Sequence, residues 1–274
     1  MGRPLPAVGP DALASLLGAT VIDLEQPRRA GMPVLDVHRP GTVFGLHRRH
    51  EPGGERRTSA SGTIWTTEHA GTHVDALCHQ AEDLRLHGGV EVTPAVQTST
   101  GFTVHGIETV APILARGVLL DLPRHEGGPL APDDAIGAER LRAAAAAGGV
   151  EITPGCVVLV RTGYGAHWDD PPRYLRAPGI DVSGSTWLAE LGVRAVGADN
   201  VVWDVPGAYD ETTCSTLPGH VVLLVRAGVL IVENLNLEAL AAAAPSAFAF
   251  VCLPLKLEGG TGSPVRPVAL LPGD

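Results

Sequence analysis

The hydrophobic and polar positions of this chain form two kinds of segment: many short apolar runs and a few longer amphipathic stretches. Apolar runs bounded by Gly, Pro or Asp are typical of buried strands. They predict strands at 20–24, 63–67, 117–122, 156–161, 193–198, 229–233 and 248–257. Helix start and stop signals predict helices at 12–17, at 135–147 and from Ser183 or Ser185 to Leu191. Interleaved strands and helices, with strands in excess, predict one β-rich α/β domain over residues 1–274.

Residues 26–57 interrupt this pattern. They are rich in Pro, Gly, Arg and His and show little periodicity. Long irregular segments inside a domain are often lids or binding loops, so we expect a lid-like segment here. His50 is its candidate substrate contact, although a solvated loop would look the same in sequence.

The densest chemistry lies between residues 69 and 79, where four ionisable side chains occupy odd-numbered positions: His69, His73, Asp75 and His79. In an extended strand all four would project from one side, whereas a helix would turn the last two away from the first. Gly71 and the β-branched Thr72 and Val74 disfavour a helix. We therefore predict an extended segment with a converging cluster.

Such a cluster is costly to bury without a partner, because desolvation penalises every charged group. Either this face is open to solvent and its histidines make ordinary hydrogen bonds, or a cation binds there. Nitrogen and carboxylate oxygen are the ligands that Zn²⁺ and Mn²⁺ take in proteins. Trp65 shares the odd-numbered face and is either a substrate contact or a core residue.

Two residues far along the chain are candidates for the rest of a metal site. Glu233 ends the aliphatic strand 229–233, where a carboxylate needs a metal, an arginine or solvent as its partner. His220 opens an apolar segment and is either a ligand or only the first residue of a helix. The sequence leaves both alternatives open.

Composition excludes several functions. The formal net charge of −10 argues against a nucleic acid or an anionic membrane as partner. The start of the chain lacks the pattern of a secretory signal, and no apolar run approaches about 20 residues, the length of a membrane span. Four scattered cysteines, without a Cys-x-x-Cys spacing, suit reduced thiols, so we expect a cytoplasmic protein.

The glycine-rich run 259–263 lacks the spacing of a phosphate loop and predicts a tight turn.

The segment His69-Ala-Gly-Thr-His73-Val-Asp75-Ala-Leu-Cys-His79 resembles the signature of the cyclase family, metal-dependent hydrolases that include bacterial kynurenine formamidase and isatin hydrolase. Arg161-Thr-Gly163, residues 220–234 and residues 254–266 extend the resemblance. It implies a swivelling β/β/α fold, a homodimer or homotetramer, and one or two Zn²⁺ or Mn²⁺ ions per chain. It further implies that His69, His73 and Asp75 bind the first ion, with Asp75 bridging.

By the same resemblance, His220 and Glu233 complete a second metal site and His79 is the acid/base. The leading hypothesis is therefore metal-assisted hydrolysis of an amide, lactam or ester in a small, cyclic or aromatic substrate. A metal-dependent cyclase, lyase or isomerase would use the same ligands without consuming water. A non-catalytic metal-binding module is the third alternative, which would give His79 no evident purpose.

Overall fold

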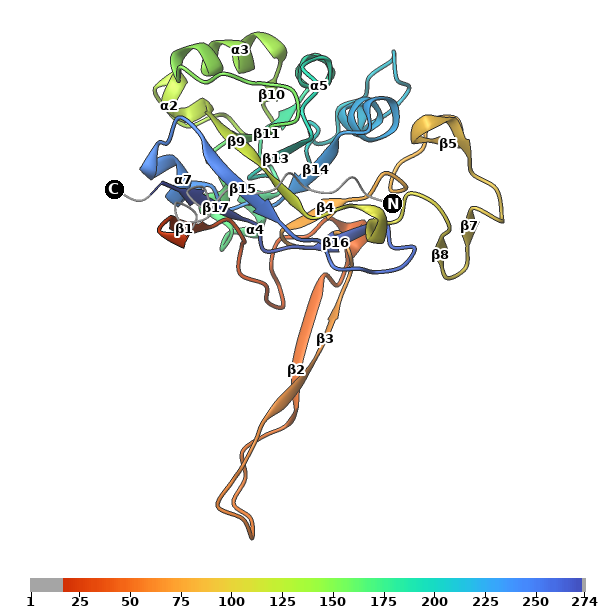
Figure 1. Ribbon diagram of the computed structural model, residues 1–274, viewed down its shortest axis with the longest axis vertical. Helices are drawn as coiled ribbons and strands as arrows, with labels where there is room; N and C mark the ends of the chain where they lie inside the picture. The colour runs from red at the N-terminus through yellow and green to blue at the C-terminus, as the bar shows by residue number, and fades with distance from the viewer. Residues whose placement is uncertain (1–16, 273–274) are drawn as a thin grey trace.

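The computed structural model describes residues 17–272, which are built around a nine-stranded mixed sheet (Figure 1). Its strand order is β1-β17-β15-β9-β11-β13-β14-β4-β16. Four parallel strands form the middle: β9 (Ile113–Asp121), β11 (Val157–Arg161), β13 (Ala195–Ala198) and β14 (Leu230–Glu233). Antiparallel strands extend both sides: β1 (Thr20–Asp23), β17 (Val268–Leu271) and β15 (Phe248–Cys252) on one, β4 (His73–Asp75) and β16 (Gly262–Pro264) on the other.

The parallel strands are apolar through most of their length, where both of their faces are buried. On one face, Val118 and Leu120 of β9 pack against α3 (Ala138–Ala147), α5 (Val182–Glu190) and the π-helix η5 (Val221–Ala227). Figure 1 shows α3 and α5 together on this side of the sheet.

The residues that alternate with Val118 and Leu120 along the parallel strands face a second hydrophobic core. Leu119 and Leu159 pack there with Phe250 of β15 and Ala269 of β17, and with helix α7 (Glu238–Ala243). This second core lies on the face of the parallel strands opposite α3, α5 and η5. This arrangement confirms the predicted sheet-rich α/β fold with few helices.

The shorter elements connect these layers. Three two-stranded ladders pair β5 (Arg85–Leu86) with β6 (Val90–Glu91), β7 (Gln97–Thr98) with β8 (Gly101–Phe102), and β10 (Ala135–Ile136) with β12 (Gly179–Ile180). The short helices are α2 (Leu122–Glu126), α4 (Pro171–Tyr174), α6 (Pro218–His220), η1 (Asp36–His38), η2 (His87–Gly89), η3 (Ile107–Thr109) and η4 (Tyr164–His167).

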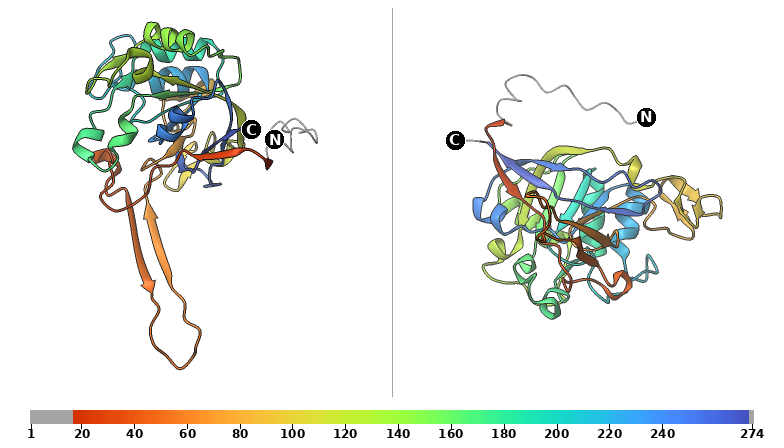
Figure 2. Two further views of the ribbon diagram at one scale, coloured as in Figure 1. Left: turned by 90° about the vertical axis from the view of Figure 1, so that its left-hand side faces the viewer. Right: turned by 90° about the horizontal axis from the view of Figure 1, so that it is seen from below.

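A long hairpin projects from the sheet. Strands β2 (Thr42–Arg48) and β3 (Ser61–Thr66) pair antiparallel, and Figure 2 shows them extending away from the remaining elements. We call residues 42–66 the arm. The predicted irregularity of segment 26–57 is therefore wrong for residues 42–48, because cross-strand pairing orders a stretch that carries no local periodicity. Its lid-like role stays a prediction.

Several predicted boundaries also shift. The helix at 135–147 begins at Ala138, because residues 135–136 pair with β12. Asp181, not Ser183 or Ser185, caps α5 by accepting from the Gly184 N–H. The strand predicted at 248–257 ends at Cys252, before a proline that cannot donate to the sheet. The helix predicted at 12–17 lies, apart from Leu17, outside the described residues.

The cysteines, together with Trp187 and Trp203, have the structural surroundings that the sequence indicates. All four cysteines are free, and Cys78 is buried in the core. Trp203 is fully buried and Trp187 packs against the same core. Among the described helices, none combines the length and the hydrophobicity that crossing a bilayer requires.

Candidate metal centre

Strand pairing brings the distant site residues together. In β4, His73 lies opposite Glu233 of β14 on one side and opposite Pro264 of β16 on the other. His220 is the last residue of α6, and its side chain reaches the same place. The structure therefore joins residues 69–79 to both candidates from the later part of the chain.

The extended conformation predicted for residues 69–79 is confirmed only for His73–Asp75. Turns flank this strand, yet the four side chains still converge. The rings of His69 and His79 stack with centroids 3.9 Å apart, and the His73 ring lies 5.2 Å from that of His69. Tertiary packing, not strand alternation, thus sets the convergence.

His69 is held by a hydrogen-bonded chain that directs one nitrogen at Asp75. The hydroxyl of Thr261 donates to Glu68 (2.6 Å), so its oxygen accepts the Nε2–H of His69 (2.8 Å). The other ring nitrogen, Nδ1, lies 2.8 Å from Asp75 Oδ1. Gly262 permits this approach, since a Cβ there would lie 2.6 Å from His69 Cε1. The tight turn predicted at 259–263 is therefore wrong for Gly262 and Ser263, which lie in β16, and it is this end of the glycine-rich run that supports the cluster.

His73 and His220 are oriented in the same way. The Nδ1–H of His73 donates to the Gly71 carbonyl (2.8 Å), and the Nδ1–H of His220 donates to Asp204 Oδ2 (2.6 Å). Each Nε2 atom lies 3.4 Å from one oxygen of Glu233 and 3.5 Å from one oxygen of Asp75. His73 and His220 contact different oxygens of each carboxylate. Hydrogen bonds of this kind fix the tautomer of metal-binding histidines in proteins.

This arrangement fits a divalent cation. Imidazole nitrogens face carboxylate oxygens at the centre of the cluster, and such pairs need a proton or a cation between them. Among the described residues, Asp75 Oδ2 is buried without a hydrogen-bond partner. Ligand atoms of two overlapping groups lie within 4.8 Å of one another: His69, His73 and Asp75, and Asp75, His79 and His220. Nitrogen and oxygen donors of this kind suit Zn²⁺ or Mn²⁺.

In the absence of a cation, the histidines and carboxylates of the cluster strongly shift one another's pKa values. Burial alone would lower the pKa of His73, but Asp75 and Glu233 raise it to about 10. Burial likewise opposes the charged form of His220, yet Asp204, Asp75 and Glu233 hold its pKa well above the usual range. The pKa of Glu233 falls to about 2, because His220 and His73 outweigh its burial. At pH 7 the metal-free cluster therefore holds protons where a metal ion would bind.

His79 differs from its neighbours. Burial lowers its pKa to about 3, and the adjacent His69 and His220 act in the same direction. Its imidazole is neutral at pH 7 and is available either as a ligand or as a proton acceptor.

A cavity of about 210 Å³ opens onto the cluster. His69, His73, His79, His220 and Glu233 line its polar side, and aliphatic side chains line the other: Val34, Leu35, Val37, Val201, Val202 and Leu217. His38 also lines it, with its ring 5.3 Å from that of His69, and burial together with His69 lowers its pKa.

Sequence reasoning missed His38, Asp204 and the Glu68–Thr261 pair. Asp204 carried a usable signal, since it follows the apolar Val201-Val202-Trp203 just as Glu233 follows an aliphatic run. The other three stand in polar surroundings and became recognisable only through their contacts. Asp199 follows β13 and accepts from Thr162, Gly163 and Gly165, so it stabilises the turn after β11.

The two candidate substrate contacts do not reach this cavity. Trp65 lies exposed on the arm, because β3 ends at Thr66 and its alternation does not continue to His69. His50 lies beyond the end of β2, where its Nδ1 is 2.7 Å from the Thr58 hydroxyl. Neither residue is among those that line the cavity.

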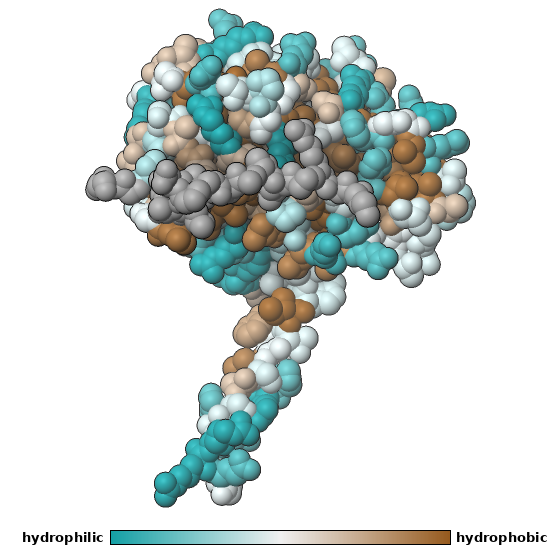
Figure 3. All heavy atoms as spheres, viewed as in Figure 1, coloured by the Kyte–Doolittle hydropathy of each residue, from teal (hydrophilic) through white to brown (hydrophobic). Residues whose placement is uncertain are grey.

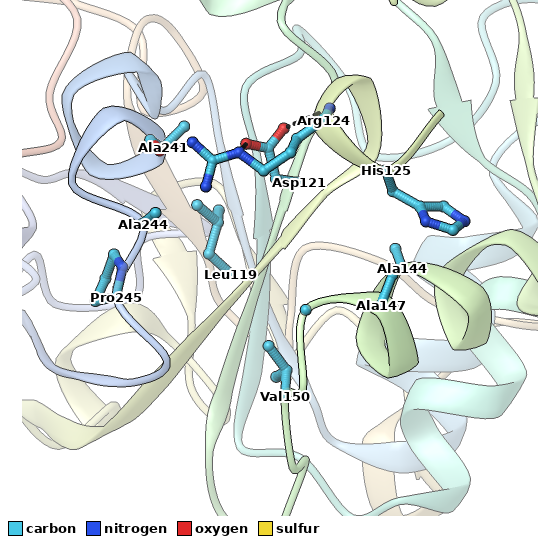
Figure 4. A pocket seen from close by; sticks show the side chains of 11 residues that line it. Leu119, Asp121, Arg124, His125, Ala144, Ala147, Val150, Ala241, Ala244 and Pro245 are labelled. Carbon is cyan, nitrogen blue, oxygen red and sulfur yellow. Dashed lines mark hydrogen bonds and ion pairs between the residues drawn. The ribbon is translucent and has the colours of Figure 1, made fainter. Parts of the chain in front are cut away.

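A second cavity, of about 260 Å³, is lined by residues from β9, α2, α3 and α7 (Figure 4). Asp121 and Arg124 lie close together there, and most of the remaining lining is alanine and other aliphatic side chains. Although it is the larger cavity, it lacks the converging histidines and carboxylates of the cluster. The chemistry of this protein is therefore assigned to the smaller one.

Comparisons with known proteins agree with this geometry. A family model described as "Putative cyclase" matches residues 22–205. Kynurenine formamidase of Bordetella avium is 38% identical over 115 residues, 40% of this chain and 47% of that protein. The matched part thus spans about half of that relative. Kynurenine formamidase of Sphingopyxis alaskensis is 28% identical over 251 residues, 90% of this chain and 95% of that protein.

Solved structures show the same fold. A crystal structure of a novel cyclase superposes with a TM-score of 0.83 at 27% identity, covering 97% of this chain and 92% of that one. Isatin hydrolase A from Ralstonia solanacearum superposes with a TM-score of 0.72 at 23% identity, covering 99% and 100%.

Metal binding should release protons from this cluster. At pH 7, His73 and His220 of the metal-free protein are protonated, since their pKa values are raised, and an ion displaces both protons. We expect calorimetric titration with Zn²⁺ in buffers of different ionisation enthalpy to give release of about two protons and binding of about two ions per chain. Affinity should rise with pH up to about 10, the pKa of His73. Binding without proton release would contradict the cluster as described.

Asp204→Asn should weaken metal binding by about 10- to 100-fold, because His220 loses the carboxylate that fixes its tautomer. Competition with a chromophoric chelator measures this affinity. Asp199→Asn is the matched control, since Asp199 is equally buried at a strand end but does not face the cluster. Equal affinities for the two variants would show that Asp204 does not orient a ligand.

Proposed function

This chain belongs to the cyclase family, and on that premise we propose that it is a metal-dependent hydrolase that cleaves an amide, lactam or ester bond of a small cyclic or aromatic molecule. One observation carries the proposal: the inward-facing ring nitrogens of His69, His73 and His220 converge on the buried carboxylates of Asp75 and Glu233. The similarity to kynurenine formamidases supports the choice of a carbonyl–nitrogen bond.

We assign the metal ligands by the same geometry. His69, His73 and Asp75 would hold one ion, and His220 together with Asp75 would hold a second. Glu233 faces both His73 and His220 and would contribute to either. When bound, a divalent ion acts as a Lewis acid toward a water molecule and toward the scissile carbonyl. Zn²⁺ and Mn²⁺ both suit this donor set.

The protein supplies orientation and proton transfer. Asp204, the Gly71 carbonyl and Thr261 hold the three ligand rings, so the inward-facing nitrogens are in position before a metal ion binds. His79 is neutral and lines the cavity, where it would accept a proton from the attacking water and deliver it to the leaving nitrogen or oxygen.

The cavity favours an uncharged substrate. Among residues 17–272, the side chains that line it include no lysine or arginine to pair with a carboxylate. Its aliphatic wall would pack against a ring and exclude bulk water from the reacting bond.

The first test is hydrolysis by the metal-loaded protein. We expect Zn²⁺- or Mn²⁺-loaded protein to open members of a panel of formamides, lactams and esters, and product made in ¹⁸O-labelled water to carry one labelled oxygen. Chelation should abolish the activity and the ion should restore it. Turnover without ¹⁸O incorporation would instead favour a cyclase, lyase or isomerase reaction on the same ligands.

His79→Ala should retain its metal content while kcat falls by about 10²- to 10⁴-fold, the usual contribution of a general acid–base. Elemental analysis beside steady-state kinetics separates the two effects. His125→Ala is the matched control, since His125 lines the second cavity and should leave both quantities unchanged. If the His79 variant loses its metal, His79 is a ligand and another group transfers the proton.

A further inference from the structure

Asn234 is a buried polar residue at the cavity of the metal centre, and the metal ligands and His79 leave it without a role. Hydrophilic side chains cover much of the face of the molecule shown in Figure 3, whereas only 2% of Asn234 is exposed. It directly follows Glu233 at the end of β14 and lines the same cavity. A buried amide is unfavourable unless its polar atoms are engaged, so each of them needs a partner.

The backbone conformation of Asn234 allows two consecutive residues to line one cavity. In a continued strand, residues 233 and 234 would point to opposite faces of the sheet. Asn234 instead has a φ of 57°, in the left-handed region, where β14 ends. Asparagine tolerates this conformation, but glycine adopts it without any steric penalty. An asparagine at such a position indicates that its side chain is used.

The backbone and the side-chain oxygen of Asn234 are engaged within the protein. Its backbone N–H donates to the Asn200 carbonyl (2.9 Å), and its backbone carbonyl accepts from the Thr72 hydroxyl (2.6 Å). Its Oδ1 accepts from the hydroxyl of Tyr174 (3.0 Å). The amino group, Nδ2, makes no hydrogen bond within residues 17–272 and is not sealed in the interior. Nδ2 is therefore open to the cavity that Asn234 lines.

Tyr174 decides which end of the amide faces the cavity. This residue ends α4, is fully buried, and packs edge-on against Trp168 with 5.0 Å between the ring centroids. Burial, together with the charges of Asp199 and Glu233, holds the pKa of its phenol well above the usual range, so the phenol keeps its proton. Asn234 Oδ1 accepts that proton. An amide turned the other way would leave a buried O–H without an acceptor, which is costly.

An amino group held in this way selects its ligand. Nδ2 has two N–H donors and no lone pair for a metal ion, so Asn234 is not a further ligand beside Glu233. The group that it binds must be a hydrogen-bond acceptor. When water adds to the carbon of a scissile carbonyl, the π electron pair moves to the carbonyl oxygen, which gains negative charge. A fixed donor to this oxygen stabilises the transition state more than the substrate.

We propose that Asn234 is a catalytic residue whose Nδ2–H donates to the carbonyl oxygen of the bond that is cleaved, and that Tyr174 is the positioning residue that holds its amide. This assignment rests on the hydrolytic function proposed above. Because Asn234 adjoins Glu233 in the chain, the carbonyl oxygen would lie beside the metal ligands.

Steady-state kinetics of the Zn²⁺-loaded protein test the role of Asn234. Asn234→Gly removes the amide but accepts the left-handed backbone without strain. With the compound of the panel that wild type hydrolyses fastest, this variant should lower kcat by about 10²- to 10³-fold and change KM by less than about 3-fold. Elemental analysis should show unchanged metal content. Asn236→Ala is the matched control, since Asn236 also follows β14 but does not line the cavity.

Tyr174→Phe tests the positioning role, because it removes only the hydroxyl. We expect kcat to fall by about 10-fold with metal content unchanged, since the amide loses the hydrogen bond that fixes its orientation. In an Asn234→Gly background the same substitution should have no further effect, because no amide remains to be held. Tyr164→Phe, at another buried tyrosine, should keep the wild-type kcat. An undiminished loss in the Asn234→Gly background would show that Tyr174 acts through packing instead.

Nuclear magnetic resonance reads the contact without turnover. The ¹⁵N–¹H resonances of the Asn234 side chain are identified by their absence from the spectrum of Asn234→Gly. We use 1-indanone, a cyclic aromatic ketone that has an acceptor oxygen but no bond to hydrolyse. At concentrations that inhibit hydrolysis competitively, it should shift the Asn234 amide resonances and leave those of Asn236 in place. Competitive inhibition without this shift would contradict the contact.

The outcomes separate this assignment from the function on which it rests. Wild type that hydrolyses no compound of the panel would overturn the proposed function. Hydrolysis by wild type together with an unchanged kcat in Asn234→Gly would overturn the role of Asn234 alone. Loss of metal from Asn234→Gly would also overturn it, because Asn234 would then support the metal site and not the substrate.

Discussion

Two buried carboxylates, Asp75 and Glu233, are the constraint on which this structure depends. The pairing of β4 with β14 places both beside His73 with almost no exposure to water. Two negative charges in such a place are strongly unfavourable unless positive charge lies between them. The surrounding histidines meet that need either with protons or by binding a metal ion, and the same groups serve in both states.

The scaffold around the carboxylates fixes the direction of each ring nitrogen. Asp204, the Gly71 carbonyl and Thr261 come from three separate parts of the chain, and each engages the nitrogen that faces away from the centre. The nitrogens that remain point inward without local competitors. A site prepared in this way binds a metal ion with little reorganisation, which is also what a hydrolytic reaction requires of its metal centre.

The site and the arm are parts of one continuous stretch of chain. The segment that leaves η1 enters β2, and β3 returns through Glu68 to His69. The root of the arm therefore continues directly into residues that line the cavity.

The sequence by itself determined the main chemistry and most of the sheet. Near-continuous apolar runs predicted the parallel strands, because a strand buried on both faces has no polar positions to vary. The ionisable residues between His69 and His79, and the carboxylate at the end of β14, indicated the cluster for the same reason: charged groups in apolar surroundings need a partner. Only the tertiary structure decided which nitrogens face inward and which residues hold them. It also placed His38 at the cavity and carried Trp65 and His50 away on the arm. These outcomes depend on contacts between residues distant in sequence, and local spacing does not encode such contacts.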